Sequence, residues 1–282
     1  MGKGLLVCLL AVLTACSSGK LIRPITPDVA ARGMVVVREL PDPLPSETAR
    51  VPDSQYVMVF TESTVVALLD MANPVPLLKE AIEGAYNNHE AAQYKARYAP
   101  IDPYTIAHDR LQGSPLITGR GDAVHMMPLV YMVEGDDGRF RPTLVFRVES
   151  RQWLGRYMYH LPTSYTKAEM RQTAPEMIAT LRHELAGGAD VLRGLMEQDA
   201  RGELRGDGLS YAYGSYYLVG GRVGGLVPAS VIQFMDCELI EEGPDHLVLR
   251  SQGDLKAPGP NGALAYGVHY FRRDQLHTFK RR

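Results

Sequence analysis

The pattern that most constrains the fold is a pair of apolar segments separated by a short acidic turn that contains glycine. The segments are residues 128–133 and 143–148, and residues 134–138 between them read Glu-Gly-Asp-Asp-Gly. Two apolar runs that flank such a turn are typical of antiparallel strands joined as a hairpin. The sequence therefore predicts a hairpin in the middle of the chain.

Further strands are predicted before and after this hairpin. Residues 34–37, 55–60 and 156–160 are short apolar or aromatic segments, and residues 64–69 are an apolar run whose period does not distinguish strand from helix. Beyond residue 210, apolar segments alternate with glycine, aspartate or proline, as strands and turns do. These later strands are predicted over residues 211–219, 226–234, 237–240, 246–250 and 265–271.

Two helical segments complete the expected fold. Asn73 and Pro74 have the order of an N-cap and a first helical residue, and the spacing that follows predicts a helix over residues 74–97. Thr166 and Glu169 have capping-box spacing at the start of a second, longer helix. Within that helix, Pro175 and residues 187–188 (Gly-Gly) indicate a late start, a kink or a break. We expect an α+β domain over residues 54–282, with a mainly antiparallel sheet and two principal helical segments.

The first sixteen residues have the order of an export signal. Lys3 is followed by an apolar run over residues 5–13, which is too short to span a bilayer, and then by the quartet Leu13-Thr14-Ala15-Cys16. This quartet resembles the lipobox of bacterial lipoproteins. The resemblance implies that residues 1–15 are a removable signal peptide and that Cys16 receives a diacylglycerol and a further acyl chain such as palmitate.

The resemblance also predicts a location. Two or more acyl chains hold a protein firmly in a membrane. An aspartate after the lipidated cysteine often signals retention in the inner membrane, whereas this chain has Ser17. We therefore expect anchoring in the cell outer membrane, facing the periplasm. Residues 16–53 are polar and rich in proline, which predicts a lipidated tether and linker ahead of the domain.

Composition excludes some classes of partner. The chain has 45% hydrophobic and 22% charged residues with a formal net charge of −2, which is typical of a globular protein. No basic surface is expected, so we do not propose a nucleic-acid partner. Cys8 leaves with the signal peptide and Cys16 carries lipid, so Cys237 has no cysteine partner. The fold must rest on its apolar core without an internal disulfide.

Searches for metal and cofactor sites give no persuasive pattern. His183 and Glu184 begin like a zinc-protease helix, but the position of the second ligand is Gly187. The acidic turn lacks the remaining ligands of a calcium loop. The segment 220–225 is rich in glycine but lacks the lysine and serine or threonine of a phosphate loop, which favours a hairpin or bulge. We expect no cofactor and no metal.

Catalytic patterns are equally weak. No Gly-x-Ser-x-Gly turn is present. A hairpin would bring His246 toward Cys237, but this cysteine is better explained as a small buried strand residue. Carboxylates at Glu238, Glu241, Glu242 and Asp245 form an acidic hairpin edge, but spacing alone does not show the geometry that glycoside hydrolysis requires. We expect no catalytic residues, although a lipid-anchored envelope hydrolase with an unrecognised site stays an alternative.

Tyrosines mark a candidate binding surface. Tyrosine combines an aromatic face with a polar tip and can contact sugar, peptide or protein, while ordinary sheet packing explains the same residues. The candidates are Tyr211, Tyr213, Tyr216 and Tyr217. We expect a non-catalytic periplasmic lipoprotein that binds an envelope protein or glycan in assembly, maintenance or inhibition. An immunity lipoprotein that neutralises a periplasmic toxin, such as a lipase or cell-wall hydrolase, is the main alternative.

Overall fold

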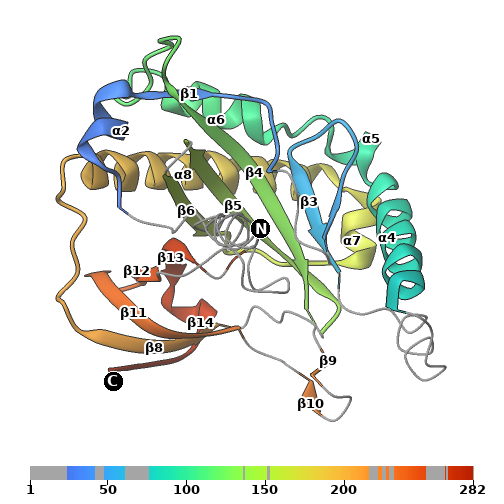
Figure 1. Cartoon of the computed structure of the whole chain (residues 1–282). Coiled ribbons are helices and arrows are strands. Elements are labelled where there is room, and N and C mark those ends of the chain that lie inside the picture. The colour runs from blue at the N-terminus through green and yellow to red at the C-terminus, as the bar shows by residue number, and fades with distance from the viewer. Residues whose placement is uncertain are drawn as a thin grey trace, which may run out of the picture.

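The fold consists of one large sheet with helices packed on one face (Figure 1). A computed structural model describes residues 24–41, 48–60, 76–135, 137–150, 153–215, 222–223, 227–228, 232–251, 264 and 266–281. Twelve strands within these residues form a single sheet of mixed but mostly antiparallel pairing, and a two-stranded ribbon lies apart from it. This architecture confirms the expected α+β class. None of the helices in the described ranges is long and apolar enough to cross a membrane.

The first half of the sheet is built around the predicted hairpin. Strands β4 (Val124–Glu134) and β5 (Arg139–Glu149) pair antiparallel over ten residue pairs. On the far side of β4 lie β3 (Tyr56–Val59), which is parallel to it, and β2 (Thr48–Arg50). Strand β6 (Leu154–His160) pairs antiparallel with β5. The hairpin is thus confirmed and forms the centre of this half.

The second half of the sheet contains the late strands in the order β14-β8-β11-β12-β13. All of its pairings are antiparallel, and it joins the first half where β13 runs parallel to β6 over three residue pairs. The segments predicted as two strands over residues 226–234 and 237–240 are largely one strand, because β11 continues through both with register shifts in its pairing. The bounds are β8 (Ser210–Ser215), β11 (Ile232–Glu242), β12 (His246–Ser251), β13 (Gly267–Arg272) and β14 (Leu276–Arg281).

Small elements complete the sheet. Strand β7 (Tyr165–Thr166) pairs with the start of β5, and β9 (Arg222–Val223) pairs with β10 (Val227–Pro228) as the separate ribbon. A single turn of 3-10 helix (Arg273–Gln275) connects β13 to β14. The glycine-rich segment 220–225 falls mostly outside the described residues, and the apolar run 64–69 falls wholly outside them.

Helix α8 (Pro175–Ala200) lies along one face of the first half of the sheet, behind β5 and β6 in Figure 1. Its side chains Leu181, Leu185 and Leu192 are fully buried in the same apolar core as Leu144 and Phe146 of β5. Burying apolar side chains in this way is the main favourable contribution to the stability of a fold.

Helix α8 starts late, at Pro175, and it is not broken at the glycine pair. Helix α7 (Lys167–Gln172) ends at Thr173 in the left-handed conformation, and Pro175 then occupies the first position of α8, where its missing N–H costs nothing. The helix continues through residues 187–188. A Cβ at Gly188 would come within 2.6 Å of the Tyr159 ring, so this glycine allows β6 to approach the helix closely.

Three other helices lie at the ends of the first half. The helix predicted over residues 74–97 is two helices, α4 (Pro76–Ala92) and α5 (Lys95–Tyr98), and its first two residues fall outside the described ranges. Helix α6 (Pro103–Leu111) was not predicted from the sequence. It begins with the Asp102 carboxylate accepting from the Tyr104 N–H, and it packs on α8.

The predicted start of the domain at residue 54 is wrong, because much of the expected linker belongs to the fold. Residues 34–36 form β1, which pairs parallel with β4, and helix α2 (Pro27–Arg32) precedes it with Thr26 as N-cap. Proline marked this segment as a linker, but Pro27 stands at the start of a helix, where proline is favoured. Val29 and Met34 are buried, which holds the segment on the sheet.

Candidate functional site

The predicted tyrosine surface is not supported where the structure describes it. Tyr211 is buried, and its hydroxyl donates to the Asp207 carboxylate at 2.5 Å, so it packs as a structural residue. Tyr213 lies on β8, whose backbone pairs with β11 on one side and β14 on the other. Tyr216, Tyr217 and the lipidation candidate Cys16 lie outside the described residues. The ordinary packing explanation is therefore confirmed for Tyr211.

The residues considered for metal or nucleophilic chemistry have structural roles. Cys237 is buried on β11 and lies opposite Ser251, while His246 bonds to Glu241 and Asp245 at 3.1 and 3.0 Å. The acidic turn is held differently from a calcium loop, because the Asp137 carboxylate accepts two hydrogen bonds from the Arg141 guanidinium. In the described parts of the chain, no three His, Cys, Asp or Glu side chains come together as metal ligands.

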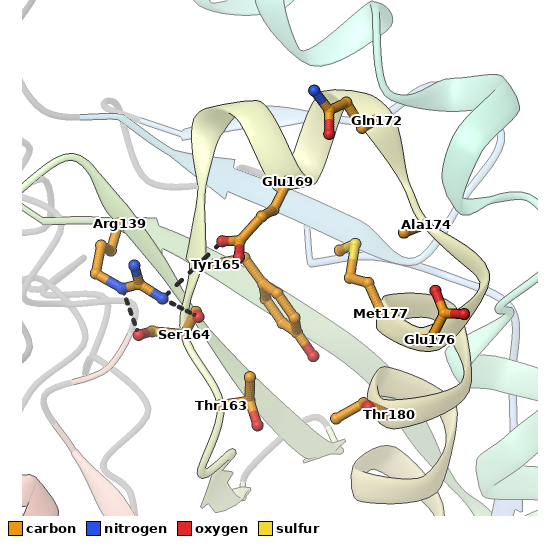
Figure 2. Close-up of a pocket in the computed structure, with 10 residues that line it drawn as sticks. All are labelled: Arg139, Thr163, Ser164, Tyr165, Glu169, Gln172, Ala174, Glu176, Met177 and Thr180. Atoms are coloured by element: carbon orange, nitrogen blue, oxygen red, sulfur yellow. Dashed lines mark hydrogen bonds and ion pairs between the residues drawn. The ribbon is translucent and has the colours of Figure 1, made fainter.

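The feature that sequence reasoning missed is a cavity at the corner between α7 and α8. Its volume is about 410 Å3, and it lies where β7 enters α7 and where α8 begins (Figure 2). The start of β5 supplies one wall, α7 and the first turns of α8 supply the opposite one, and the strand leading into β7 forms the floor. The lining residues are Arg139, Thr163, Ser164, Tyr165, Glu169, Gln172, Ala174, Glu176, Met177 and Thr180.

The corner that shapes the cavity is fixed by hydrogen bonds. Thr166 and Glu169 form the predicted capping box, in which each side chain accepts from the other residue's backbone N–H. The hydrogen bonds from Thr166 lower the pKa of the Glu169 carboxyl, so this group is ionised at neutral pH. The Arg139 guanidinium donates to the Ser164 hydroxyl at 2.8 Å and to its carbonyl at 2.5 Å. The wall and floor are therefore tied together before any ligand binds.

A tyrosine that lines the cavity has a buried hydroxyl group without a partner in the described part of the chain. Tyr165 is only 4% exposed, and its Oη makes no hydrogen bond to any described residue. Figure 2 shows its ring descending between Thr163 and Met177, with the hydroxyl directed toward Thr180. Leaving a buried hydroxyl unpaired costs free energy, so each such group in a native structure calls for an explanation.

A second unpaired atom belongs to Glu184, which does not line the cavity but bonds to its lining residue Thr163. Glu184 follows Thr180 by one helical turn, and its Oε1 accepts a 2.5 Å hydrogen bond from Thr163. Its Oε2 is buried without a partner. Burial raises the pKa of Glu184 above its ordinary value, and burial followed by the nearby Glu184 charge raises the pKa of Tyr165. The two unpaired oxygens therefore share one weakly solvated region.

A different buried cluster has all of its polar groups engaged. Asp199, near the end of α8, is 3% exposed and pairs with Arg250 of β12 at 2.6 Å. The Tyr157 hydroxyl donates to the same carboxylate at 2.5 Å, and the Ile25 N–H donates at 3.0 Å. The Trp153 indole N–H donates to the Pro24 carbonyl at 2.9 Å. This cluster holds Pro24 and Ile25 on the fold.

Two histidines link the halves of the sheet. His160 of β6 and His269 of β13 lie 3.2 Å apart between Nε2 and Nδ1, with Thr143 and Ser251 at the outer ends of the chain at 3.1 and 3.0 Å. Burial lowers the pKa of His160 well below its ordinary value, and the neighbouring His269 adds to this effect. Ser251 is 2% exposed and His269 is fully buried, so this serine is not presented to a substrate.

Comparison with known proteins returned no family match, no similar curated protein and no similar solved structure. The class of the protein is therefore given by its own fold and site, which are an α+β domain with a half-open cavity at a helix corner.

Proposed function

We propose that this protein is a lipid-anchored, non-catalytic periplasmic lipoprotein that binds an envelope partner through the cavity between β7, α7 and α8. The observation that carries the proposal is the buried Tyr165 hydroxyl, which belongs to a cavity-lining residue and has no hydrogen-bond partner among the described residues. Binding sites combine apolar walls with a few placed polar groups, and here Met177 and Ala174 supply apolar wall beside Tyr165.

The position of the anchor supports the same function. The lipobox resemblance places acyl chains on Cys16, and the described fold begins at Pro24, whose carbonyl is held by Trp153. Only seven residues, 17–23, then separate the anchor from this fixed point. A chain extends at most about 3.3–3.6 Å per residue, so the domain stays close to the membrane surface. We expect its partner to be an envelope protein within that reach.

The anchor is tested by metabolic labelling in cells. Wild-type protein should incorporate labelled palmitate and fractionate with the outer membrane, whereas Cys16→Ala should lose the label. A soluble wild-type protein without label would contradict the anchor. Recovery of labelled protein in the inner membrane would contradict only the proposed sorting.

Partner binding is tested by photo-crosslinking in cells from the rim of the cavity. A photoreactive residue at Gln172, which is exposed and lines the cavity, should capture a discrete partner. The same residue at Asp122, in an exposed turn before β4, serves as the control position. Equal capture from both positions would contradict binding at the cavity.

Two tryptophan substitutions at neighbouring positions of α8 distinguish an effect of blocking the cavity from an effect of disturbing the helix. Thr180→Trp places a large ring in the cavity, whereas Ala179→Trp places it on the adjacent exposed position, which does not line the cavity. Capture from Gln172 should be lost in the first variant and retained in the second. Unchanged capture in folded Thr180→Trp would contradict the proposal.

A further inference from the structure

The inner end of the cavity is short of hydrogen-bond donors. The Tyr165 Oη and the Glu184 Oε2 are both buried and unpaired, while the Thr163 hydroxyl is already committed to the other oxygen of Glu184. An ionised carboxylate accepts hydrogen bonds only, and a phenol oxygen accepts as well as donates. A ligand group rich in donors would therefore suit these acceptors.

The charges around the cavity favour a cation. Arg139 is the one basic side chain among the ten lining residues, and its guanidinium is occupied by Ser164 and lies 4.0 Å from Glu169. Glu169 and Glu176 add two carboxylates to the lining. Glu184 does not line the cavity, but it accepts a hydrogen bond from the lining residue Thr163. Opposite charge near a partly buried carboxylate favours its ionised form, so a bound cation would also offset the burial of Glu184.

The walls between the rim and the inner end suit an aliphatic stem. Figure 2 shows Met177 beside the ring of Tyr165, and Ala174 also lines the cavity. Long charged side chains commonly lay their methylene groups along such apolar surface while the charged end reaches polar groups. The cavity thus offers apolar contacts from Met177 and Ala174 next to the unpaired Tyr165 hydroxyl.

We propose that the cavity receives a lysine side chain of the partner protein, whose ammonium group donates to Tyr165 Oη and Glu184 Oε2. This proposal rests on the proposed function and names the chemistry of the partner. Lysine fits better than arginine because its ammonium is compact and has three donors. The planar arginine fork prefers both oxygens of a carboxylate, and one oxygen of Glu184 is already bonded to Thr163.

The test uses the full-length acylated protein in detergent micelles. N-acetyl-lysine methylamide is titrated while the 13C-labelled methyl group of Met177 is followed by NMR. The lysine probe should shift this signal in a saturable way. The norleucine analogue, which lacks only the ammonium, should bind at least about tenfold more weakly. A tenfold change in affinity corresponds to the loss of one charge-assisted hydrogen bond. Equal binding of the two probes would overturn the proposal.

Three variants locate the ammonium. Tyr165→Phe and Glu184→Gln should each weaken binding of the lysine probe by about tenfold, because each removes one acceptor or its charge. The matched control is Asp190→Asn, an exposed carboxylate on the same helix that does not line the cavity, which should change binding by less than about twofold since solvent screens it. Unchanged binding in Tyr165→Phe and Glu184→Gln would overturn the proposal and leave an ordered water as the partner of both atoms.

The two proposals fail differently. Capture of a partner from Gln172 without binding of the lysine probe would overturn the lysine proposal and retain the proposed function. Binding of the probe without capture in cells would overturn the proposed function and retain an ammonium site. Absence of both would overturn both.

Discussion

Two buried polar clusters at opposite ends of α8 differ in how completely their groups are paired. Around Asp199, the carboxylate accepts from Arg250, Tyr157 and the Ile25 backbone. At the other end, Tyr165 Oη and Glu184 Oε2 are buried without partners. A paired cluster can stabilise the fold by itself, whereas an unpaired one lowers stability until something binds. We therefore interpret the paired Asp199 cluster as part of the structural scaffold, and the unpaired atoms as part of the proposed binding site.

The largest effect is expected from breaking the paired cluster. Asp199→Ala would leave Arg250 buried without its carboxylate, which typically costs about 3–5 kcal/mol in the free energy of unfolding. Urea denaturation followed by circular dichroism measures this loss. The matched control is Asp190→Ala on the same helix, which removes an exposed ion pair with Arg110 and should cost far less. Equal losses in both variants would show that the buried cluster has no special structural role.

Acidification should weaken a third cluster, the histidine link between the halves of the sheet. His160 is neutral in the folded protein because its pKa is lowered, whereas in the unfolded chain it titrates near 6.5. Below that pH the unfolded state binds a proton that the folded state does not. The free energy of unfolding should therefore fall by about 1.4 kcal/mol per pH unit below pH 6.5 until the folded pKa is reached.

A substitution identifies the group that causes this pH dependence. His160→Gln should be less stable at pH 8, because it disturbs the bonds to Thr143 and His269, but its stability should depend less on pH between 6.5 and 5. His246 acts in the opposite direction, because its raised pKa favours the folded state in acid. An unchanged slope in His160→Gln would assign the acid sensitivity to other groups.

Much of the fold was predictable because it depends on local patterns. The hairpin of β4 and β5, the Thr166 and Glu169 capping box and the late strands all follow from residue spacing and turn residues. The segment before residue 54 was misjudged because β1 pairs with β4 some ninety residues later, as Met34 opposite Val124 shows. A strand of three residues is too short for its sequence pattern to indicate which distant strand it pairs with.

The candidate site was not predictable for a related reason. Its cavity joins Arg139 of β5 to the α7 and α8 corner, and the sequence indicated only the capping box. Nothing in the sequence distinguishes Tyr165 from the other tyrosines, because its lack of a hydrogen-bond partner among the described residues is a property of the packed structure. The sequence favoured Tyr211, Tyr213, Tyr216 and Tyr217 instead because they are clustered, although Tyr211 is buried beside Asp207.

A moderate effect is expected from removing a paired hydroxyl. Tyr157→Phe deletes the donor to Asp199 and keeps the ring, so it should lower the free energy of unfolding by about 1.5–3 kcal/mol, as hydrogen bonds to charged groups do. Denaturant titration at pH 7.5 checks this value. A loss near zero would mean that Arg250 and the Ile25 N–H satisfy the carboxylate without the phenol.

The most direct test of the proposed binding site is to remove a tyrosine hydroxyl in the same way near the other end of α8. Tyr165→Phe removes a hydroxyl that has no internal partner, so unfolding at pH 7.5 without ligand should change by less than about 0.5 kcal/mol, while binding of the lysine probe should weaken about tenfold. Measuring Tyr157→Phe and Tyr165→Phe side by side compares the two clusters directly. A loss of stability in Tyr165→Phe as large as that in Tyr157→Phe would show that its hydroxyl is already bonded within the fold, and would contradict the assignment of this cavity as a binding site.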